Sequence, residues 1–305
     1  MTNSTIAKKI IELKQQKNAI ILAHNYQIAE VQDIADFCGD SLDLAIKATK
    51  TDADVIVFCG VKFMGESAKI LNPNKTVILP DPTANCPMAG MVDPESLKAM
   101  INDHPQAEVV SYINTTAEIK SLTDVCCTSS NGVNVVKSVK SKEVIFVPDI
   151  NLGQYIQRFI KDKKMVLWQG LCPTHHKIKK GEINKLKTDH PEAEVLVHPE
   201  CRPEIIDIAD HAFSTNGMVN YVKESKVHKF IIGTESGICH RLEKENPNKQ
   251  FFSLPSAICP NMKKITVEKI IKSLETLEPT INLSQEILTK ANVPLQKMMN
   301  IGRGD

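Results

Sequence analysis

The chain lacks the features that mark membrane proteins and nucleic-acid-binding proteins. Its net charge is only +1 over 305 residues, and both signs are mixed along the sequence, so no basic face is available for nucleic acid or an anionic membrane. The longest apolar runs, such as VIVF and FII, are far shorter than the ~20 residues that a bilayer requires. The N-terminal stretch has no apolar block typical of a signal peptide. We therefore expect a cytoplasmic protein that binds neither nucleic acid nor membrane.

Closely spaced cysteine pairs of the C-x-x-C type are also absent, although the chain has nine cysteines. Because cytosolic disulfides are rare, we expect reduced thiols or metal ligands. The missing pairs argue against an ordinary structural zinc site. Six cysteines lie in or beside apolar strand and helix patterns, and we interpret them as small buried hydrophobic residues: Cys38, Cys59, Cys126, Cys127, Cys201 and Cys239.

The three remaining cysteines share a spacing and a neighbour. Cys86, Cys172 and Cys259 stand 86 and 87 residues apart, and each is followed directly by proline, in the words NCPMAG, LCPTHH and ICPNMK. Near-equal spacing over such a distance suggests three copies of one structural unit. We expect each copy to deliver one thiolate to a shared point. A centre with three protein ligands keeps one position free for substrate.

Short apolar runs bounded by turn residues alternate with helical patterns, which is typical of a parallel α/β architecture. Each third of the chain has three such runs, and the third run of each leads into its Cys-Pro word. The predicted strands are 19–25, 54–59, 76–80, 107–113, 143–147, 164–168, 193–198, 229–233 and 250–254. The words DHPQAEVV and DHPEAEVL match at an offset of 86, which supports a repeat.

These patterns predict an α/β protein made of three analogous αβα units with short parallel sheets, arranged about a pseudo-threefold axis. The predicted units are residues 1–85, 86–171 and 172–264, and the segment 265–305 is expected to pack on the first unit. The chain should begin with an amphipathic helix. The apolar side of that helix is predicted to carry Ile6, Ile10, Ile11 and Leu13.

Polar residues follow the first predicted strand of every unit at matching positions. They are His24, Tyr26, Tyr112, Asn114, His198 and Glu200. Small hydroxyl residues stand 17 positions after the first polar residue of each unit, at Ser41, Ser129 and Thr215. Ligands of open parallel sheets lie beyond the carboxyl ends of the strands, so these groups belong on one side of each unit. Three units around one axis would turn them all toward a central cavity.

Each of these positions also has a purely structural interpretation. Ser41, Ser129 and Thr215 open helical patterns and could be N-caps, or they could help a helix N-terminus bind an anion, and both roles can coexist. Glu200 could pair with Arg202 instead of working in a site. His175, three residues after Cys172, lies either near the metal centre or in a solvated loop. The matching positions in three units favour the functional interpretation.

Three thiolates on one axis suit a [4Fe–4S] cluster, because three cysteines bind three irons and leave the fourth iron open. An open iron can act as a Lewis acid toward hydroxyl and carboxylate oxygens. Zinc with three cysteines and an open position is also possible, and so is a purely structural role for the cysteines. Around such a centre, five residues are candidates for general acid and base work: His24, Tyr26, Tyr112, His198 and Glu200.

The words LAHNYQ, GDSLDLA, SYINTTAEIK, CTSSN, LVHPEC, STNGM and TESGICHRL, together with the Cys-Pro words, resemble the quinolinate synthase family. The resemblance runs roughly from Ile20 to Glu268. It implies three α/β units around a [4Fe–4S] cluster and a role in NAD biosynthesis. It also implies the reaction, in which iminosuccinate (iminoaspartate) and dihydroxyacetone phosphate give quinolinate, phosphate and water.

The resemblance also implies roles for individual residues. The cluster ligands would be Cys86, Cys172 and Cys259. The catalytic residues would be His24, Tyr26, Tyr112, His198 and Glu200. The substrate-binding residues would be His24, Ser41, Tyr112, Ile113, Asn114, Ser129, His198, Pro199, Glu200 and Thr215.

Some points stay open after this comparison. Lys62 stands where the family often has a histidine, so no role is carried over to it. The enzyme that supplies iminosuccinate is a possible protein partner. Two other functions compete with the one that the resemblance implies. One is a different [4Fe–4S] hydro-lyase of hydroxy-dicarboxylates, and the other is a non-catalytic metal-binding or cluster-binding protein.

Overall fold

The computed structural model describes residues 3–305, which form three four-stranded sheets, one in each third of the chain. The first sheet contains β1 (Ala19–His24), β2 (Phe37–Gly39), β3 (Val55–Cys59) and β4 (Thr76–Ile78). The second contains β5 (Glu108–Tyr112), β6 (Val125–Cys127), β7 (Glu143–Val147) and β8 (Lys164–Leu167). The third contains β9 (Glu194–Val197), β10 (His211–Ala212), β11 (Lys229–Gly233) and β12 (Gln250–Ser253).

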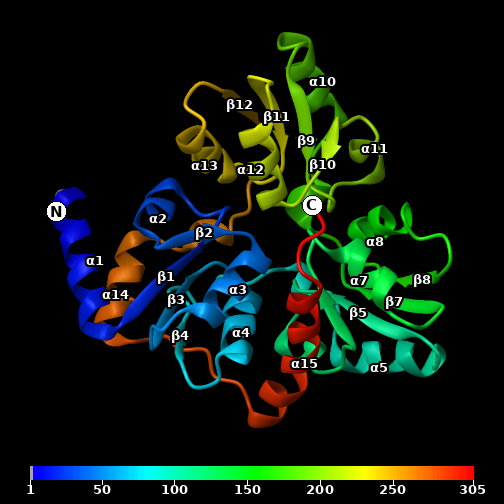
Figure 1. Cartoon of the computed structure of the whole chain (residues 1–305), viewed down its shortest axis with the longest axis horizontal. Helices are drawn as coiled ribbons and strands as arrows, with labels where there is room; N and C mark the ends of the chain where they lie inside the picture. The colour runs from blue at the N-terminus through cyan, green and yellow to red at the C-terminus, as the bar shows by residue number, and fades with distance from the viewer. Residues whose placement is uncertain (1–2) are drawn as a thin grey trace.

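All three sheets have the same strand order and the same direction of pairing. The orders are β2-β1-β3-β4, β6-β5-β7-β8 and β10-β9-β11-β12, and every pair of neighbours is parallel. Figure 1 shows the sheets in three lobes, with the end of the chain between them. The α/β fold class and the repeated unit predicted from the sequence are therefore confirmed.

Helices follow the strands in each unit. The first unit has α1 (Asn3–Lys17), α2 (Ala29–Ile34), α3 (Ser41–Lys50) and α4 (Lys62–Leu71). The second has η1 (Met88–Gly90), α5 (Pro94–Asp103), α6 (Ala117–Lys120), α7 (Gly132–Ser138) and α8 (Ile150–Gln157). The third has α9 (Pro173–His176), α10 (Lys180–Asp189), α11 (Pro203–Ile206), α12 (Thr215–Glu224), α13 (Ile238–Glu245) and η2 (Met262–Lys264). The chain continues with α14 (Val267–Thr276) and α15 (Gln285–Ile301).

The central strands are buried on both faces, which explains why they read as nearly continuous apolar runs. All five residues of β3, VIVFC, are buried between helices. All nine predicted strands are present. The prediction of three strands for each unit was nevertheless wrong, because each sheet has a fourth strand at its edge: β2, β6 and β10. These strands have only three, three and two residues, too few for a periodic pattern to be visible.

One hydrogen bond recurs at the same place in all three sheets. A backbone N–H of the first strand donates to an aspartate carboxylate that precedes the edge strand. The pairs are Ile21 with Asp36, Val109 with Asp124 and Val195 with Asp210, each at 2.8 Å. Their offsets of 88 and 86 residues equal those between His24, Tyr112 and His198. The repeat therefore extends from the pattern of residue types to the bonds that shape each sheet.

The segment 265–305 contacts the second unit as well as the first. Helix α14 packs on α1, whereas α15 packs on α4 of the first unit and also on α6 and β6 of the second unit. Helix α15 thus lies between two units (Figure 1). The unit boundaries at 85/86 and 171/172 stay predictions.

The predicted first helix exists, although one residue of its apolar side was placed wrongly. Ile10 is buried and Ile6 and Leu13 are half-buried, whereas Ile11 is 53% exposed. Successive helical residues point about 100° apart, so Ile11 faces solvent when Ile10 faces the core. None of the helices in the described part of the chain has both the length and the apolar character that a membrane span requires.

The recurring aspartate bond generates a stability test. Asp124→Ala would leave the buried N–H of Val109 without its acceptor, so we expect a loss of about 1 kcal/mol in the free energy of unfolding. Urea unfolding followed by circular dichroism measures this loss. Asp103→Ala, at the exposed end of α5, is the control and should change stability by less than about 0.5 kcal/mol. Equal effects of both substitutions would contradict the structural role of Asp124.

Candidate active site

A cavity of about 250 Å³ is lined by residues from all three units. Its wall contains the three cysteines that precede proline, Cys86, Cys172 and Cys259, and the prolines themselves. The predicted polar residues that line it are His24, Tyr26, Ser41, Tyr112, Asn114, Ser129, His198, Glu200 and Thr215. The side chains of Ile113 and Pro199 are buried and do not line it. The sequence positions that match across the repeat thus meet in one place.

The loops before the three cysteines are anchored in the same way. A backbone N–H at or near a helix start donates to the carbonyl oxygen two residues before each cysteine. The pairs are Lys62 to Ala84 at 2.8 Å, Ile150 to Gly170 at 2.8 Å and Ser236 to Ala257 at 2.9 Å. Because each bond ties a loop to its own sheet-and-helix unit, the position of each thiol depends on the fold of that unit.

Two buried carboxylates hold the cysteine backbone in the second and third units. The N–H of Cys172 donates to Asp149 at 3.0 Å, and the N–H of Cys259 donates to Glu235 at 3.1 Å. Both carboxylate side chains are fully buried. Sequence reasoning missed these residues, although their offset of 86 residues equals that between Tyr112 and His198. The first unit has Val61 at the corresponding position, so its loop lacks this contact.

Two of these half-buried cysteines, Cys86 and Cys172, have surroundings that oppose negative charge on the thiol. All nine cysteines, which lie within the described residues, are free. Burial raises the pKa of Cys86 to about 12 and the pKa of Cys172 well above its ordinary value, and the carboxylate of Glu200 adds to both shifts. A thiolate at Cys86 or Cys172 therefore needs a nearby cation. Together with Cys259 on the same cavity, these thiols fit a positively charged metal centre.

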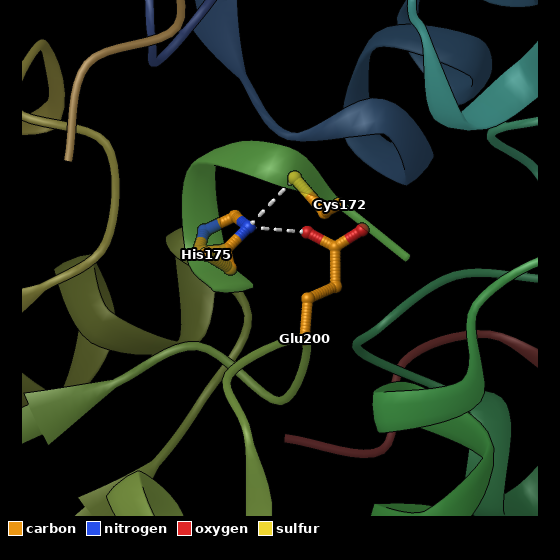
Figure 2. A group of neighbouring side chains, drawn as sticks. All are labelled: Cys172, His175 and Glu200. Atoms are coloured by element: carbon orange, nitrogen blue, oxygen red, sulfur yellow. Dashed lines mark hydrogen bonds and ion pairs between the residues drawn. The ribbon is translucent and has the colours of Figure 1, made fainter. Parts of the chain in front are cut away.

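His175 lies beside this group, and not in a solvated loop. It sits in the short helix α9 and is only 1% exposed. Its Nδ1 atom lies 3.2 Å from the sulfur of Cys172 and 2.8 Å from a carboxylate oxygen of Glu200, as Figure 2 shows. Its Nε2 atom lies 2.8 Å from the hydroxyl of Thr234. Cys172, His175 and Glu200 together form a donor set that could hold a metal ion.

Glu200 is a buried carboxylate between two imidazoles. Its Oε2 atom lies 2.8 Å from His175 and 3.2 Å from His198, whose rings stack at 4.5 Å. Burial opposes ionisation of Glu200, but the two imidazoles outweigh it and hold its pKa well below the usual value. Its Oε1 atom has no hydrogen-bond partner among residues 3–305. Since such buried oxygens are normally paired, this one is available to a ligand.

The alternative pairing of Glu200 with Arg202 was wrong. Arg202 pairs with Glu204 at 2.7 Å. Glu200 instead turns into the cavity, where the two histidines supply its partners.

The protonation states of the other candidates follow from burial. Burial lowers the pKa of His24 to about 4, so its imidazole is neutral at pH 7. Burial and the charge of Glu200 raise the pKa values of Tyr26 and Tyr112 well above the ordinary value, so both phenols keep their protons. The hydroxyl of Tyr26 contacts that of Thr234 and lies 3.4 Å from His175. The site therefore holds phenol donors beside a carboxylate.

The predicted hydroxyl residues do not cap their helices, so that interpretation was wrong. Asp40 caps α3 and Ser214 caps α12, each from the position before the hydroxyl residue that lines the cavity. Ser129 stands three residues before α7, and its hydroxyl lies 3.1 Å from Nε2 of His198. The hydroxyl of Thr215 accepts a bond of 2.9 Å from the Asn25 amide. The caps leave the hydroxyls free to face the cavity.

Three parallel α/β units that direct thiols, phenols and a histidine-bound carboxylate into one cavity are typical of an α/β enzyme with a candidate metal site. A family model described as Quinolinate synthetase A protein matches residues 8–300. The chain is 52% identical to a quinolinate synthase of Thermodesulfovibrio yellowstonii over 302 residues, 99% of each chain. It is 49% identical to a quinolinate synthase of a Geobacter species over 304 residues, 99% of this chain and 100% of the relative.

A relative named quinolinate synthase 1, from Methanosarcina acetivorans, is 49% identical over 302 residues, 99% of each chain. The chain therefore belongs to the quinolinate synthase family, and the resemblance inferred from its motifs is confirmed. It is an enzyme of this type, with a function in NAD biosynthesis.

The lowered pKa of His24 generates a test by pH. The unfolded protein binds a proton near pH 6.5 and the folded protein only near pH 4, so stability falls as the pH drops through this range. One such histidine lowers the free energy of unfolding by up to about 2 kcal/mol when the pH falls from 6.5 to 5. We expect His24→Gln to make urea unfolding less pH-dependent than in the unsubstituted protein.

His228→Gln, at an exposed position, is the control for this experiment and should keep the original pH dependence. If His24→Gln and His228→Gln gave the same pH profile, the burial of a neutral His24 would be refuted.

Proposed function

We propose that this protein condenses iminosuccinate with dihydroxyacetone phosphate to give quinolinate, phosphate and two waters. Membership of the family supports this reaction. The observation that carries the proposal is the convergence of three thiols and the Glu200–histidine group on one cavity. A condensation followed by loss of water needs an acid and a base close to the reacting carbons. The phenol of Tyr26 and the carboxylate of Glu200 are such a pair.

We infer that Cys86, Cys172 and Cys259 hold a [4Fe–4S] cluster with one iron free of protein ligands. The three free thiols and the absence of C-x-x-C pairs in the sequence favour such a cluster over a structural zinc ion. When bound, the cluster supplies a Lewis acid for substrate oxygens. Asp149 and Glu235 would keep the backbone of two of the ligands in place.

In this proposal the substrate carboxylates bind to the hydroxyls and amide that the three units present. Ser41, Ser129 and Thr215 stand at or just before helix starts, where backbone N–H groups also favour anions. Asn114 faces the cavity, and its side-chain oxygen has no hydrogen-bond partner in the described chain. His24, Tyr112 and His198 belong to the proposed binding set as well, and Ile113 and Pro199 would take part only through their backbone, because their side chains do not line the cavity.

Proton transfers fall to groups whose protonation states suit the task. Glu200 is ionised and can accept a proton, with His198 and His175 stabilising its charge. Tyr26 and Tyr112 are protonated and can donate. His24 is neutral at pH 7 and can accept a proton from substrate. The individual steps are left unassigned among the proposed catalytic residues His24, Tyr26, Tyr112, His198 and Glu200.

The remaining predictions complete the proposal. We place the reaction in the cytoplasm and the three units about a pseudo-threefold axis. Because an imine hydrolyses in water, we also propose that the enzyme that supplies iminosuccinate works close to this one.

Serine substitutions test the ligand assignment. Replacing Cys86, Cys172 or Cys259 by serine should remove the brown colour, the bound iron and the activity, because each thiolate is needed to hold the cluster. The control is Cys38→Ser, because Cys38 does not line the cavity. This substitution should leave the colour, the bound iron and the activity unchanged. Anaerobic purification, iron analysis and a quinolinate assay give the measurement. A full iron content in all three variants would overturn the assignment, and turnover of a dicarboxylate without dihydroxyacetone phosphate would overturn the proposed reaction.

A second test concerns the phenol of Tyr26. Tyr26→Phe removes one proton donor, so we expect kcat to fall by about 10²-fold to 10⁴-fold while the iron content stays unchanged. Tyr155→Phe is the matched control, because Tyr155 has a hydroxyl contact to Ala212 but lies outside the cavity. Steady-state kinetics of both variants give the kcat values that test this prediction. Wild-type kcat in Tyr26→Phe would exclude this phenol from the chemistry.

A further inference from the structure

Residues 302–305, with the sequence Gly-Arg-Gly-Asp, run from the end of α15 to the point between the three lobes (Figure 1). We refer to these four residues as the clamp. Gly302 has a φ of +73°, a conformation that residues with a Cβ seldom adopt, and it turns the chain away from the helix axis. None of the clamp residues lines the cavity. The clamp residues instead contact the sequence neighbours of residues that line the cavity.

In the first unit, the clamp holds the start of α3. The guanidinium of Arg303 donates to Asp40 at 2.6 Å and to Asp43 at 2.9 Å. Asp40 is the N-cap of α3, and its other carboxylate oxygen accepts the N–H groups of Leu42 and Asp43. Arg303 therefore fixes the cap that positions Ser41.

In the third unit, the clamp holds the start of α12. Arg303 donates to the hydroxyl of Ser214 at 2.9 Å, and the carboxylate of Asp305 accepts the N–H of Ser214 at 2.7 Å. Ser214 is the N-cap of α12 and precedes Thr215. Gly217 makes room for this contact, because a Cβ there would lie 2.5 Å from Oδ2 of Asp305.

In the second unit, the backbone of the clamp meets the residues before α7. Gly304 donates its N–H to the carbonyl oxygen of Ser130 at 2.9 Å. The amide of Asn131 donates to the carbonyl oxygen of Gly302 at 2.9 Å. A Cβ at Gly304 would lie 2.9 Å from the Ser130 oxygen, so this approach also depends on glycine. Ser130 follows Ser129 directly.

The clamp thus touches one immediate neighbour of each cavity hydroxyl: Asp40 beside Ser41, Ser130 beside Ser129, and Ser214 beside Thr215. We propose that Arg303 is a positioning residue that holds Ser41 and Thr215, while the backbone of Gly302 and Gly304 holds Ser129, in one arrangement for the dicarboxylate substrate. The proposal rests on the proposed function above. It adds a specific role for a residue outside the cavity.

Charge supports a requirement for arginine at this position. Asp40, Asp43 and Asp305 all lie within 3.4 Å of the guanidinium, and Asp40 is only 5% exposed. A planar guanidinium can serve several acceptors at once, whereas a lysine ammonium is a single point charge. Removing the cation leaves three neighbouring carboxylates, of which Asp40 is buried, without a positive charge between them. The helix starts of the first and third units would then move apart.

Arg303→Ala tests the proposal, with Arg303→Lys as the conservative variant. Arg158→Ala is the matched control, because Arg158 is likewise an arginine in an ion pair, with Asp207, but it lies on the surface. We expect Arg303→Ala to raise the KM for iminosuccinate roughly tenfold or more with unchanged iron content, and Arg303→Lys to lie between it and the unsubstituted protein. Added guanidinium ion, but not sodium, should recover part of the lost activity, since the site is partly open to solvent.

Hydrogen exchange measured by mass spectrometry gives a readout that needs no turnover. Arg303→Ala should speed exchange at the starts of α3 and α12, whose capping residues the guanidinium contacts, while Arg158→Ala should leave both unchanged. Unchanged exchange, or a change in α3 alone, would overturn the clamp. Unchanged KM with faster exchange at both helices would overturn the positioning role. If Arg303→Ala does not fold, Asp305→Asn is measured in the same way, with exchange expected to rise at α12.

These results are separable from the proposed function. If the unsubstituted protein makes no quinolinate, the proposed reaction fails, and hydrogen exchange still decides whether the clamp holds the helix starts. If it makes quinolinate and Arg303→Ala does so with an unchanged KM, only the positioning role fails.

Discussion

Three thiols from distant parts of a chain can meet at one cavity only if three separate supports deliver them to it. Here each support is a four-stranded parallel sheet whose last strand leads into a Cys-Pro loop, and a backbone hydrogen bond ties each loop to its own unit. The cysteines therefore owe their positions to the sheets as a whole. This also explains why the polar candidates meet at the same cavity, since they follow the first strand of each sheet.

Burial sets the chemistry of that cavity. The thiols of Cys86 and Cys172 and the phenols are held in their protonated forms by the loss of solvent, whereas Glu200 stays ionised because two histidines contact it. A metal centre with positive charge would convert the thiols into thiolates and leave the phenols available as acids. The same site thus combines groups that release protons with a carboxylate that accepts them. Such a separation of protonation states is what acid and base catalysis at neutral pH requires.

The parts of the fold that the sequence predicted are those with long or repeated signals. The nine predicted strands show clear apolar runs in the sequence, and Tyr26, Ser129 and Glu200 could be placed because their positions recur across the units. Strands such as β10, with two residues, leave no periodic signal. Asp149, Glu235 and Arg303 were missed for another reason. Their roles depend on contacts with residues far away in the sequence, which only the folded chain brings together. The separations are 23 positions for Asp149, 24 positions for Glu235 and up to 263 positions for Arg303.

The open coordination position is the centre of the proposed function, and Mössbauer spectroscopy of iron-57-enriched protein tests it most directly. Spectra of anaerobically prepared protein are recorded with and without a stable dicarboxylate such as malate. Three iron sites bound by cysteine should keep their spectra, while the fourth, lacking a protein ligand, should change when the dicarboxylate binds. Four equivalent iron sites that ignore the dicarboxylate, or protein without a cluster after anaerobic reconstitution, would contradict the assignment.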